Sequence, residues 1–380
     1  MKKKLMKSVL AVILFAVLFL VGCDNKEEEI PVFNETEKET ISIIALGDNL
    51  LHMPVVNSGK RADGTYDYSH LFDKLQPQIM EADISVIGQE TVFGGRELGY
   101  SGYPLFNSPS DMGKTLVNEG FDVVLHASNH VMDKFSAGVE NTLAFWADYP
   151  MVTVLGINES ELDKYTIDIK EIKGAKIAML NYTYGTNGIT VPAEKSYLVN
   201  LIDEEKIHSD VRYAEENTDF TIAFMHWGTE YSTTPDEEQK ALAKKMCQWG
   251  VDLIIGSHPH VIEPVEWVKS ENGNEMLVYY SLGNFVSRQL EARNLLGGIA
   301  NVLLSYDGVD VEISDYSFMP IVTHYDKTFS IFDVYPLKEY SNEIAAGHGV
   351  ASRDGAVSVE RFKNMVNETF EGYDVSILDM

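Results

Sequence analysis

Residues 251–264 read Val251-Asp-Leu-Ile-Ile-Gly-Ser-His-Pro-His-Val-Ile-Glu-Pro264, an apolar run followed by two closely spaced histidines. Its short apolar run, Leu253 to Ile255, predicts a buried strand. His258 and His260 follow the strand, and Pro259 between them favours an extended residue before it. Extended residues two apart project to the same side, so two imidazoles are expected together at the end of a core strand. Imidazoles placed in this way are typical metal ligands, although a pair of turn histidines without that role would have the same sequence.

Four other apolar runs also end in polar side chains that can bind a metal. Strands are expected at residues 41–46, 83–87, 121–126 and 220–225. Ligands gather at the carboxyl ends of strands in layered α/β proteins. Any one of these residues could be a helix cap or turn residue, but five such strand ends are hard to explain in that way. We therefore expect one site that holds divalent metal, with donors enough for a pair of ions, formed by His258, His260 and the residues after the other strands: Asp48, His52, Glu90, Asn129, His130, Asp133, His226 and Glu230.

Five motifs in this order resemble one known family over roughly residues 41–290. They are Gly47-Asp48, Asn129-His130 with Asp133, His226-Trp227-Gly228 with Glu230, Gly256-Ser257-His258-Pro259-His260-Val261, and Ser281-Leu282-Gly283-Asn284-Phe285. They resemble the poly-γ-glutamate capsule biosynthesis (CapA-like) family, which is similar to the calcineurin-like metallophosphatases.

The resemblance implies an α/β fold built as a four-layer α-β-β-α sandwich, with the site at the strand ends. It also implies that His130 is the catalytic imidazole, with Asp133 in the same motif. Ser281 and Asn284 are expected to hydrogen-bond the ligand loops from behind. The metal contacts that it implies are Asp48, Glu90, Asn129, His226, His258 and His260.

Two positions depart from the wider pattern of the metallophosphatases. Position 50 is Leu where those proteins have the histidine of an Asp-x-His motif, and His52 could substitute for it. The second motif reads Gly88-Gln89-Glu90, with a longer side chain at Gln89 than the usual Asn-x-Glu pattern allows. Both departures leave the number of ions open, and the choice between Mn, Fe, Zn and Mg as well.

The first residues have the composition of a targeting segment. Residues 1–22 combine four lysines with an apolar run and predict a secretory signal. Leu20-Val21-Gly22-Cys23 resembles a lipobox, which implies cleavage before Cys23 and lipid on its thiol; the alternative is an uncleaved membrane anchor. Either way the chain is expected at the extracytoplasmic face of the cell membrane. Residues 23–40 are expected to be a flexible acidic tether, residues 41–340 the main domain, and residues 341–380 a helical extension packed on it.

Composition limits the classes of partner. Hydrophobic residues make up 45% of the chain, which is enough for a sizeable core. The formal net charge of −28 excludes binding of nucleic acid through a general basic field. An anionic substrate must therefore be held locally, by metal or by a small basic patch.

Three functions remain open from the sequence. The first is hydrolysis or transfer of amide bonds in an anionic envelope polymer such as poly-γ-glutamate, in which a hydroxide made at the metals attacks and His130 protonates the leaving group. The second is a metal-dependent phosphoesterase, since a fold does not fix its substrate. The third is a non-catalytic accessory that binds the polymer or a membrane synthase or export complex.

Overall fold

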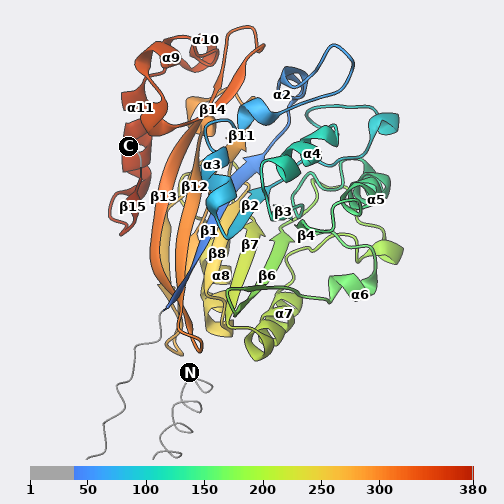
Figure 1. Cartoon of the computed structure of the whole chain (residues 1–380), viewed down its shortest axis with the longest axis vertical. Coiled ribbons are helices and arrows are strands. Elements are labelled where there is room, and N and C mark those ends of the chain that lie inside the picture. Colours follow the sequence, from blue (N-terminus) through green and yellow to red (C-terminus); the bar gives the residue numbers. More distant parts are fainter. Residues whose placement is uncertain (1–37, 379) are drawn as a thin grey trace, which may run out of the picture. The chain divides into compact units, whose positions relative to one another are not determined.

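The computed structural model describes residues 38–378 and residue 380. The predicted signal, Cys23 and most of the predicted tether therefore lie outside the described residues. Among the residues that are described, no helix is both long and apolar enough to cross a membrane. The described chain forms two β-sheets with helices around them (Figure 1).

The first sheet has nine strands and a central order of β14-β13-β12-β1-β2-β3-β4. One half is parallel and consists of β1 (Glu39–Asn49), β2 (Ile84–Gly88), β3 (Val123–Leu125) and β4 (Thr153–Leu155). The other half is antiparallel and consists of β12 (Leu296–Tyr306), β13 (Val311–Tyr325) and β14 (Phe332–Pro336). Two short strands pair beside this path, β11 (Asn284–Val286) with β1 and β15 (Ser376–Ile377) with β13.

The second sheet has six strands in the order β5-β6-β7-β8-β10-β9. Its strands are β5 (Asp168–Ile172), β6 (Ala175–Thr183), β7 (Phe220–His226), β8 (Leu253–Ser257), β9 (Val265–Lys269) and β10 (Glu275–Tyr279). The four strands from β6 to β10 along this order are parallel. Lys173-Gly174 predicts the turn of a hairpin within residues 165–184. Strands β5 and β6 form this hairpin, and both turn residues have positive φ.

Alternation along the strands of the second sheet separates two apolar layers. On β7, Phe220, Ile222 and Phe224 join the core cluster that also contains residues of β1. Ala223 and Met225, which point the other way, join a second cluster with helices α7 (Glu204–Asn217) and α8 (Glu237–Trp249). Successive strand residues point to opposite faces, so Phe220, Ile222 and Phe224 lie between the sheets, whereas Ala223 and Met225 lie under α7 and α8. Each large side chain buried in this way contributes about 1.5–3 kcal/mol.

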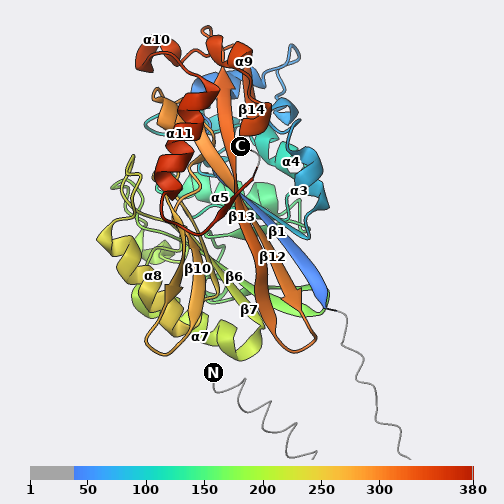
Figure 2. The same cartoon turned by 90° about the vertical axis from the view of Figure 1, so that its left-hand side faces the viewer.

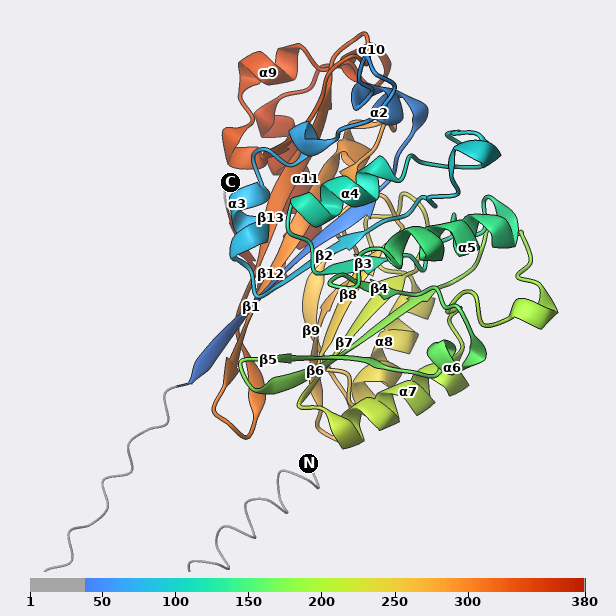
Figure 3. The ribbon, with the colours of Figure 1, turned by 45° about the vertical axis from the view of Figure 1, so that its right-hand side comes forward.

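Helices also cover the outer face of the first sheet. Helices α3 (Gln76–Glu81), α4 (Asp111–Asn118) and α5 (Phe135–Trp146) lie beside its parallel half (Figure 3). Helix α11 (Val359–Phe370) lies over its antiparallel half, where the rings of Phe318 and Phe370 are 4.7 Å apart (Figure 2). Together with α7 and α8, these helices complete the order helix, sheet, sheet, helix.

The remaining helical elements are short. The α-helices are α2 (Met53–Ser58), α6 (Glu161–Lys164), α9 (Asn342–Ala346) and α10 (Ala351–Asp354). The 3-10 helices are η2 (Ser69–Leu71), η3 (Arg96–Leu98), η4 (Ala193–Lys195), η5 (Ala292–Leu295) and η6 (Leu337–Glu339). The described part of residues 341–380 thus contains three helices and β15, and Phe362 and Phe370 of α11 belong to the cluster between and around the sheets.

One expected helix is divided in the structure. A single helix over residues 71–81 is the interpretation that the apolar pattern favours, but η2 ends at Leu71 and α3 begins only at Gln76. Pro77 lies in the first turn of α3. Proline lacks an N–H and clashes with the preceding turn, so it is tolerated at the start of a helix and not inside it.

Candidate metal centre

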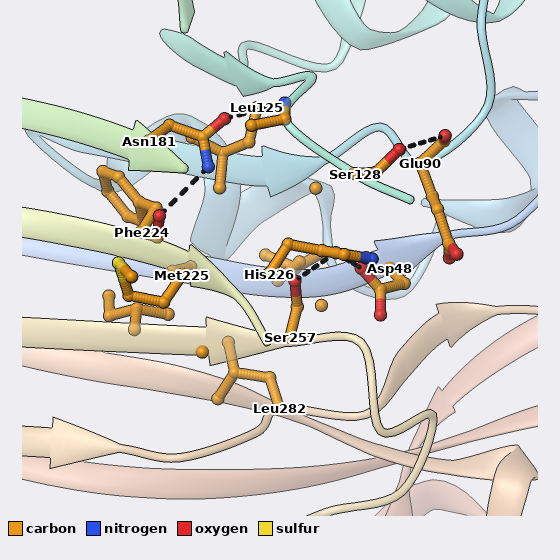
Figure 4. A pocket seen from close by; sticks show the side chains of 17 residues that line it. Asp48, Glu90, Leu125, Ser128, Asn181, Phe224, Met225, His226, Ser257 and Leu282 are labelled. Carbon is orange, nitrogen blue, oxygen red and sulfur yellow. Dashed lines mark hydrogen bonds and ion pairs between the residues drawn. The ribbon is translucent and has the colours of Figure 1, made fainter. Parts of the chain in front are cut away.

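The carboxyl ends of parallel strands in both sheets meet at the same edge of the sandwich. Asp48 is the penultimate residue of β1, His226 is the last residue of β7, and His258 directly follows β8. Glu90 and Asn129 lie in the loops after β2 and β3. All these side chains are at most 2% exposed. Five separate segments can form one site only if their ends converge in this way. Figure 4 shows Asp48, Glu90 and His226 lining one pocket.

Distances between the polar atoms place the six predicted ligands in one cluster. Asp48 lies at its centre, with Oδ1 3.7 Å from Nδ1 of His226 and Oδ2 3.8 Å from Nδ1 of His260. Nε2 of His260 is 3.9 Å from Oε1 of Glu90. The imidazole of His226 also connects the last two members: its Nε2 lies 3.0 Å from Oδ1 of Asn129, and its ring centre lies 4.8 Å from that of His258.

Two groups within the cluster have the geometry of a metal site. In one, ligand atoms of Asp48, Glu90 and His260 all lie within 4.8 Å of one another. In the other, His260 is joined by His258 and by the exposed Glu230. His260 is therefore common to both groups, and its one free ring nitrogen can ligate an ion in either of them. His52, the other candidate, belongs to neither group; its Nδ1 lies 3.3 Å from the backbone nitrogen of Arg288.

Burial opposes charge on the two acids and three histidines among the six predicted ligands. It raises the pKa of Asp48 to about 7 and that of Glu90 well above its usual range. It lowers the pKa of His258 and of His260 to about 3, and that of His226 well below its usual value. Without a cation the acids thus favour protonation, while the imidazoles are neutral and ready to bind. A divalent cation stabilises the carboxylate form and binds the neutral imidazole form.

Unpartnered atoms in the cluster also fit a metal. Three buried atoms have no hydrogen-bond partner within the described residues: both carboxylate oxygens of Glu90 and Nδ1 of His258. Leaving such a group without a partner costs about 1–3 kcal/mol, more if it is charged. A mixed set of carboxylate, amide and imidazole donors suits Mn, Fe or Zn better than Ca. The residues present therefore fit a divalent metal.

The backbone of the His-Pro-His segment differs from the extended conformation that the proline favours. His258 has φ +99° and His260 has φ +59°, both in the left-handed region. Such residues cost of the order of 1–3 kcal/mol each and persist where the surroundings hold them. Here the N–H of His258 donates to Oδ2 of Asp48 at 3.0 Å, and the N–H of Tyr231 donates to the carbonyl of Pro259 at 2.8 Å. The two imidazoles thus converge through a held, strained turn and not through alternation along a strand.

Ser281 and Asn284 lie behind the ligand loop. Oδ1 of Asn284 is 3.0 Å from Nδ1 of His260, so Nδ1 carries the proton and donates a hydrogen bond to Asn284. The lone pair of Nε2, on the side of Glu90, is then free to bind a metal. The hydroxyl of Ser281 donates to the carbonyl of Val261 at 2.8 Å. Partners of this kind fix the tautomer and orientation of a metal-binding histidine.

His130 and Asp133 form a separate pair beside the cluster. Nδ1 of His130 donates to Oδ2 of Asp133 at 2.8 Å, and the N–H of Phe106 donates to the same oxygen at 2.6 Å. The pair is buried, with His130 6% exposed. A carboxylate that accepts from Nδ1 leaves Nε2 of the imidazole available for proton transfer.

A cavity of about 710 Å³ opens beside these groups. It is large enough for several units of a chain-like substrate. Residues 94–109, with four glycines and two prolines, predict a loop long enough to lie over a site, and residues 103–106 of this loop form part of the cavity wall. The polar side chains that line it include His52, His130, Asn187, Glu230, His260 and Arg288.

Three residues of the site carry no clear signal in the sequence. The first is Asn187, whose Oδ1 accepts from Nδ2 of Asn129 at 3.3 Å. This hydrogen bond leaves Oδ1 of Asn129 turned toward His226. Asn187 is followed by glycine, which indicates only a turn. The ring of Tyr184 lies 4.5 Å from that of His258, and its position soon after β6 is the one available hint. Ser257, inside the motif itself, has Oγ 3.0 Å from Nδ1 of His226.

The two departures from the metallophosphatase pattern have structural explanations. Leu50 is 2% exposed and lines the cavity, so the histidine expected there is replaced by an apolar wall. Oε1 of Gln89 accepts from Asn49 at 2.8 Å, while its Nε2 donates to the carbonyl of Thr91 at 2.8 Å. The side chain of Gln89 is thus held by hydrogen bonds to Asn49 and Thr91, whereas the carboxylate of Glu90 remains part of the cluster.

Fold and site together define an α/β protein of two packed sheets with a candidate divalent-metal centre at their shared edge. The particular family follows from sequence: the profile of the bacterial capsule synthesis protein family PGA_cap matches residues 42–289. The chain belongs to this family.

Relatives and solved structures were also compared. A "PGA biosynthesis protein CapA" of Bacillus subtilis (strain 168) is 33% identical over 187 residues, which span 46% of this chain and 45% of that protein. A "Capsule biosynthesis protein CapA" of Bacillus anthracis is 24% identical over 333 residues, 84% of this chain and 78% of that protein. Among solved structures, a calcineurin-like phosphoesterase of Bacillus subtilis has a TM-score of 0.42 at 14% identity, covering 87% of this chain and 97% of that one. The NAD nucleotidase of Haemophilus influenzae has a TM-score of 0.46 at 12% identity, covering 90% and 57%.

Proposed function

We propose that this chain is a divalent-metal-dependent enzyme of capsule synthesis that cleaves or transfers amide bonds of an anionic envelope polymer, most simply poly-γ-glutamate. The observation that carries the proposal is that one large cavity is lined by His260 and Glu230, which belong to the metal-ligand groups, and also by His130, whose Nδ1 donates to Asp133. Membership of the capsule synthesis family supports the envelope polymer as substrate. The amide bond, the lipid anchor at Cys23 and the extracytoplasmic location are parts of the proposal.

The metal centre would be held by Asp48, Glu90 and His260 in one group and by His258, His260 and Glu230 in the other, with His226 and Asn129 adjoining. When bound, the cation supplies Lewis-acid chemistry: it polarises the bond under attack and activates water near neutral pH. Because the ligand side chains other than that of the exposed Glu230 are almost fully buried, they are already in place before substrate enters.

The His130–Asp133 pair would move the proton. Asp133 holds Nδ1 of the imidazole, and the backbone N–H of Phe106 holds Asp133 in turn. Nε2 of His130 first takes up a proton, which makes the imidazolium beside Asp133, and then gives that proton to the leaving amine. Proton transfer by a positioned side chain contributes about 10²–10⁴-fold to a rate. In a transferase the acceptor amine would enter through the same cavity.

Cleavage of defined polymers by the purified full chain tests this proposal. Poly-γ-glutamate is supplied with Mn²⁺, next to a panel of phosphomonoesters and phosphodiesters, and products are followed by chain length. We expect polymer cleavage that His258→Ala reduces at least 100-fold. His208→Ala is the matched control, because His208 is exposed and stacks on Trp249 outside the cluster.

Equal rates for the wild type and His258→Ala would overturn the proposal. Turnover of phosphoesters alone would replace it by a phosphoesterase. Polymer production that is normal in cells with His130→Asn would favour a non-catalytic accessory. Lipid anchoring is tested by fractionation: wild-type protein is expected with the membrane and Cys23→Ser in the soluble fraction.

A further inference from the structure

Arg288 stands in the wall of the cavity without an acidic partner. Of the described residues that line the cavity, it is the sole lysine or arginine. Its Nε is buried and has no hydrogen-bond partner, and in the described chain no carboxylate oxygen lies within 4.0 Å of its guanidinium. This is notable in a chain with 58 acidic and 30 basic residues. Three other arginines do have acidic partners: Arg61 with Asp67, Arg293 with Glu291, and Arg361 with Asp354.

The guanidinium is held in place by an aromatic ring. Its central carbon lies 4.4 Å from the ring centre of Phe329, which belongs to the loop between β13 and β14. Asp326 fixes this loop by accepting from the N–H groups of Ser330 at 2.7 Å and Ile331 at 2.9 Å. A guanidinium that is already oriented loses little freedom when it binds a ligand. Arg288 is thus prepared for an anion that enters the cavity.

The charge balance in the cavity favours a carboxylate over a phosphate. One guanidinium faces a wall that also contains Glu230 and Glu291, and Glu291 is occupied by Arg293 at 3.5 Å. Away from the metal groups, the single positive charge of Arg288 balances one carboxylate, whereas a doubly charged phosphate would be balanced only against the metal groups themselves. The planar fork of arginine also matches both oxygens of a carboxylate.

We propose that Arg288 binds a carboxylate of the substrate that is not under attack and so selects carboxylate-bearing chains. This inference rests on the function proposed above. In a γ-linked glutamate chain, the α-carboxylate of each unit stays free and is attached to the carbon that bears the amide nitrogen. Every amide that reaches the metal cluster therefore brings a carboxylate with it. Arg288 would anchor this group while His130 and His260, on the same cavity, face the amide.

Binding of two matched oligomers to the full chain tests this role. One probe is a labelled γ-linked glutamate oligomer, and the other is the same oligomer with its α-carboxylates converted to primary amides. Arg288→Gln is expected to weaken binding of the first probe about 10- to 100-fold, the value of a hydrogen bond to a charged group, and to leave the second unchanged. Arg288→Lys should restore part of the loss. Arg61→Gln removes the same charge at an exposed position outside the cavity wall and is expected to bind both probes like the wild type.

The outcomes of this test separate the role of Arg288 from the proposed function. If the wild type cleaves the polymer but Arg288→Gln binds the carboxylate oligomer equally well, this inference is wrong and the proposed function stands. An equal loss for both oligomers would mean that Arg288 supports the fold of the wall, which also overturns the inference. If the wild type neither binds nor cleaves the polymer and Arg288 instead sets the KM for a phosphodiester, the proposed function and this inference both fail.

Discussion

Glu90→Gln separates metal binding from folding, because it should change the two in opposite directions. Both oxygens of Glu90 are buried without a hydrogen-bond partner among the described residues, and burial raises the pKa of its carboxyl group. The contribution of this carboxyl group to folding stability is therefore fully present below its pKa in the unfolded chain, about 4.3. It is lost as the pH rises toward its pKa in the folded protein. At pH 8 the metal-free wild type is therefore destabilised by the buried carboxyl group, and glutamine avoids this cost. We expect the free energy of unfolding of metal-free Glu90→Gln to exceed that of the metal-free wild type by about 1–3 kcal/mol.

Metal should stabilise the wild type more than the variant. An ion present at a thousand times its dissociation constant stabilises the folded state by about 4 kcal/mol. If loss of the carboxylate weakens binding 100-fold, the same ion concentration gives the variant only about 1.4 kcal/mol. Metal should therefore add at least about 2.7 kcal/mol more to the wild type than to Glu90→Gln.

Urea unfolding of the full chain at pH 8, with EDTA and then with a Mn²⁺ series, measures both quantities. Glu263→Gln is the matched control: Glu263 is 0% exposed, its Oε1 also lacks a partner, and burial raises its pKa to about 8. It belongs to neither group of metal-ligand geometry, and its Oε2 accepts from Gln239.

We expect Glu263→Gln to stabilise the metal-free protein, increasingly as the pH rises from about 4.3 to 8, by up to about 1.4 kcal/mol per pH unit. Its response to Mn²⁺ should equal that of the wild type. An unchanged Mn²⁺ response in Glu90→Gln, or an equal loss of response in Glu263→Gln, would refute the reasoning.

Three other perturbations test separate parts of the structure. Asp133→Asn should lower kcat about 10²-fold or more while the metal content stays at the wild-type level, and a parallel loss of metal would contradict a role in proton transfer. Asn187→Ala frees the amide of Asn129 and should weaken metal binding about 10-fold in a calorimetric titration; unchanged affinity would remove Asn187 from the site. Gly256→Ala would place a Cβ 1.9 Å from a backbone carbonyl oxygen and should cost about 3 kcal/mol of stability, whereas Gly185→Ala enters open space and should cost little in the same melting assay.

Much of the fold can be predicted because alternation and apolar runs are local properties of the chain. Leu253 to Ile255 forms part of β8, and the hairpin turn at Lys173-Gly174 is where the sequence predicts it. The helix boundary at Gln76 could also have been found, since Pro77 cannot lie inside a helix.

The site is less predictable because its geometry depends on contacts between distant segments. The left-handed turn at His258 is held by Asp48, 210 positions away along the chain, and no local pattern indicates that bond. Asn187 likewise acts through Asn129 and His130, which lie on another loop. Donor residues can therefore be chosen from sequence, whereas the residues that orient them need the folded chain.

Metal content of the purified full chain tests most directly whether the distant segments form one ion-binding centre. The protein is equilibrated with Mn²⁺, desalted and measured by mass spectrometry of the elements, next to the double variant His258→Ala/His260→Ala and the control His208→Ala. We expect at least about one ion per chain in the wild type and the control, and close to none in the double variant, with all three folded by circular dichroism. Equal metal content in the wild type and the double variant, or a folded wild type that retains no ion, would contradict the account.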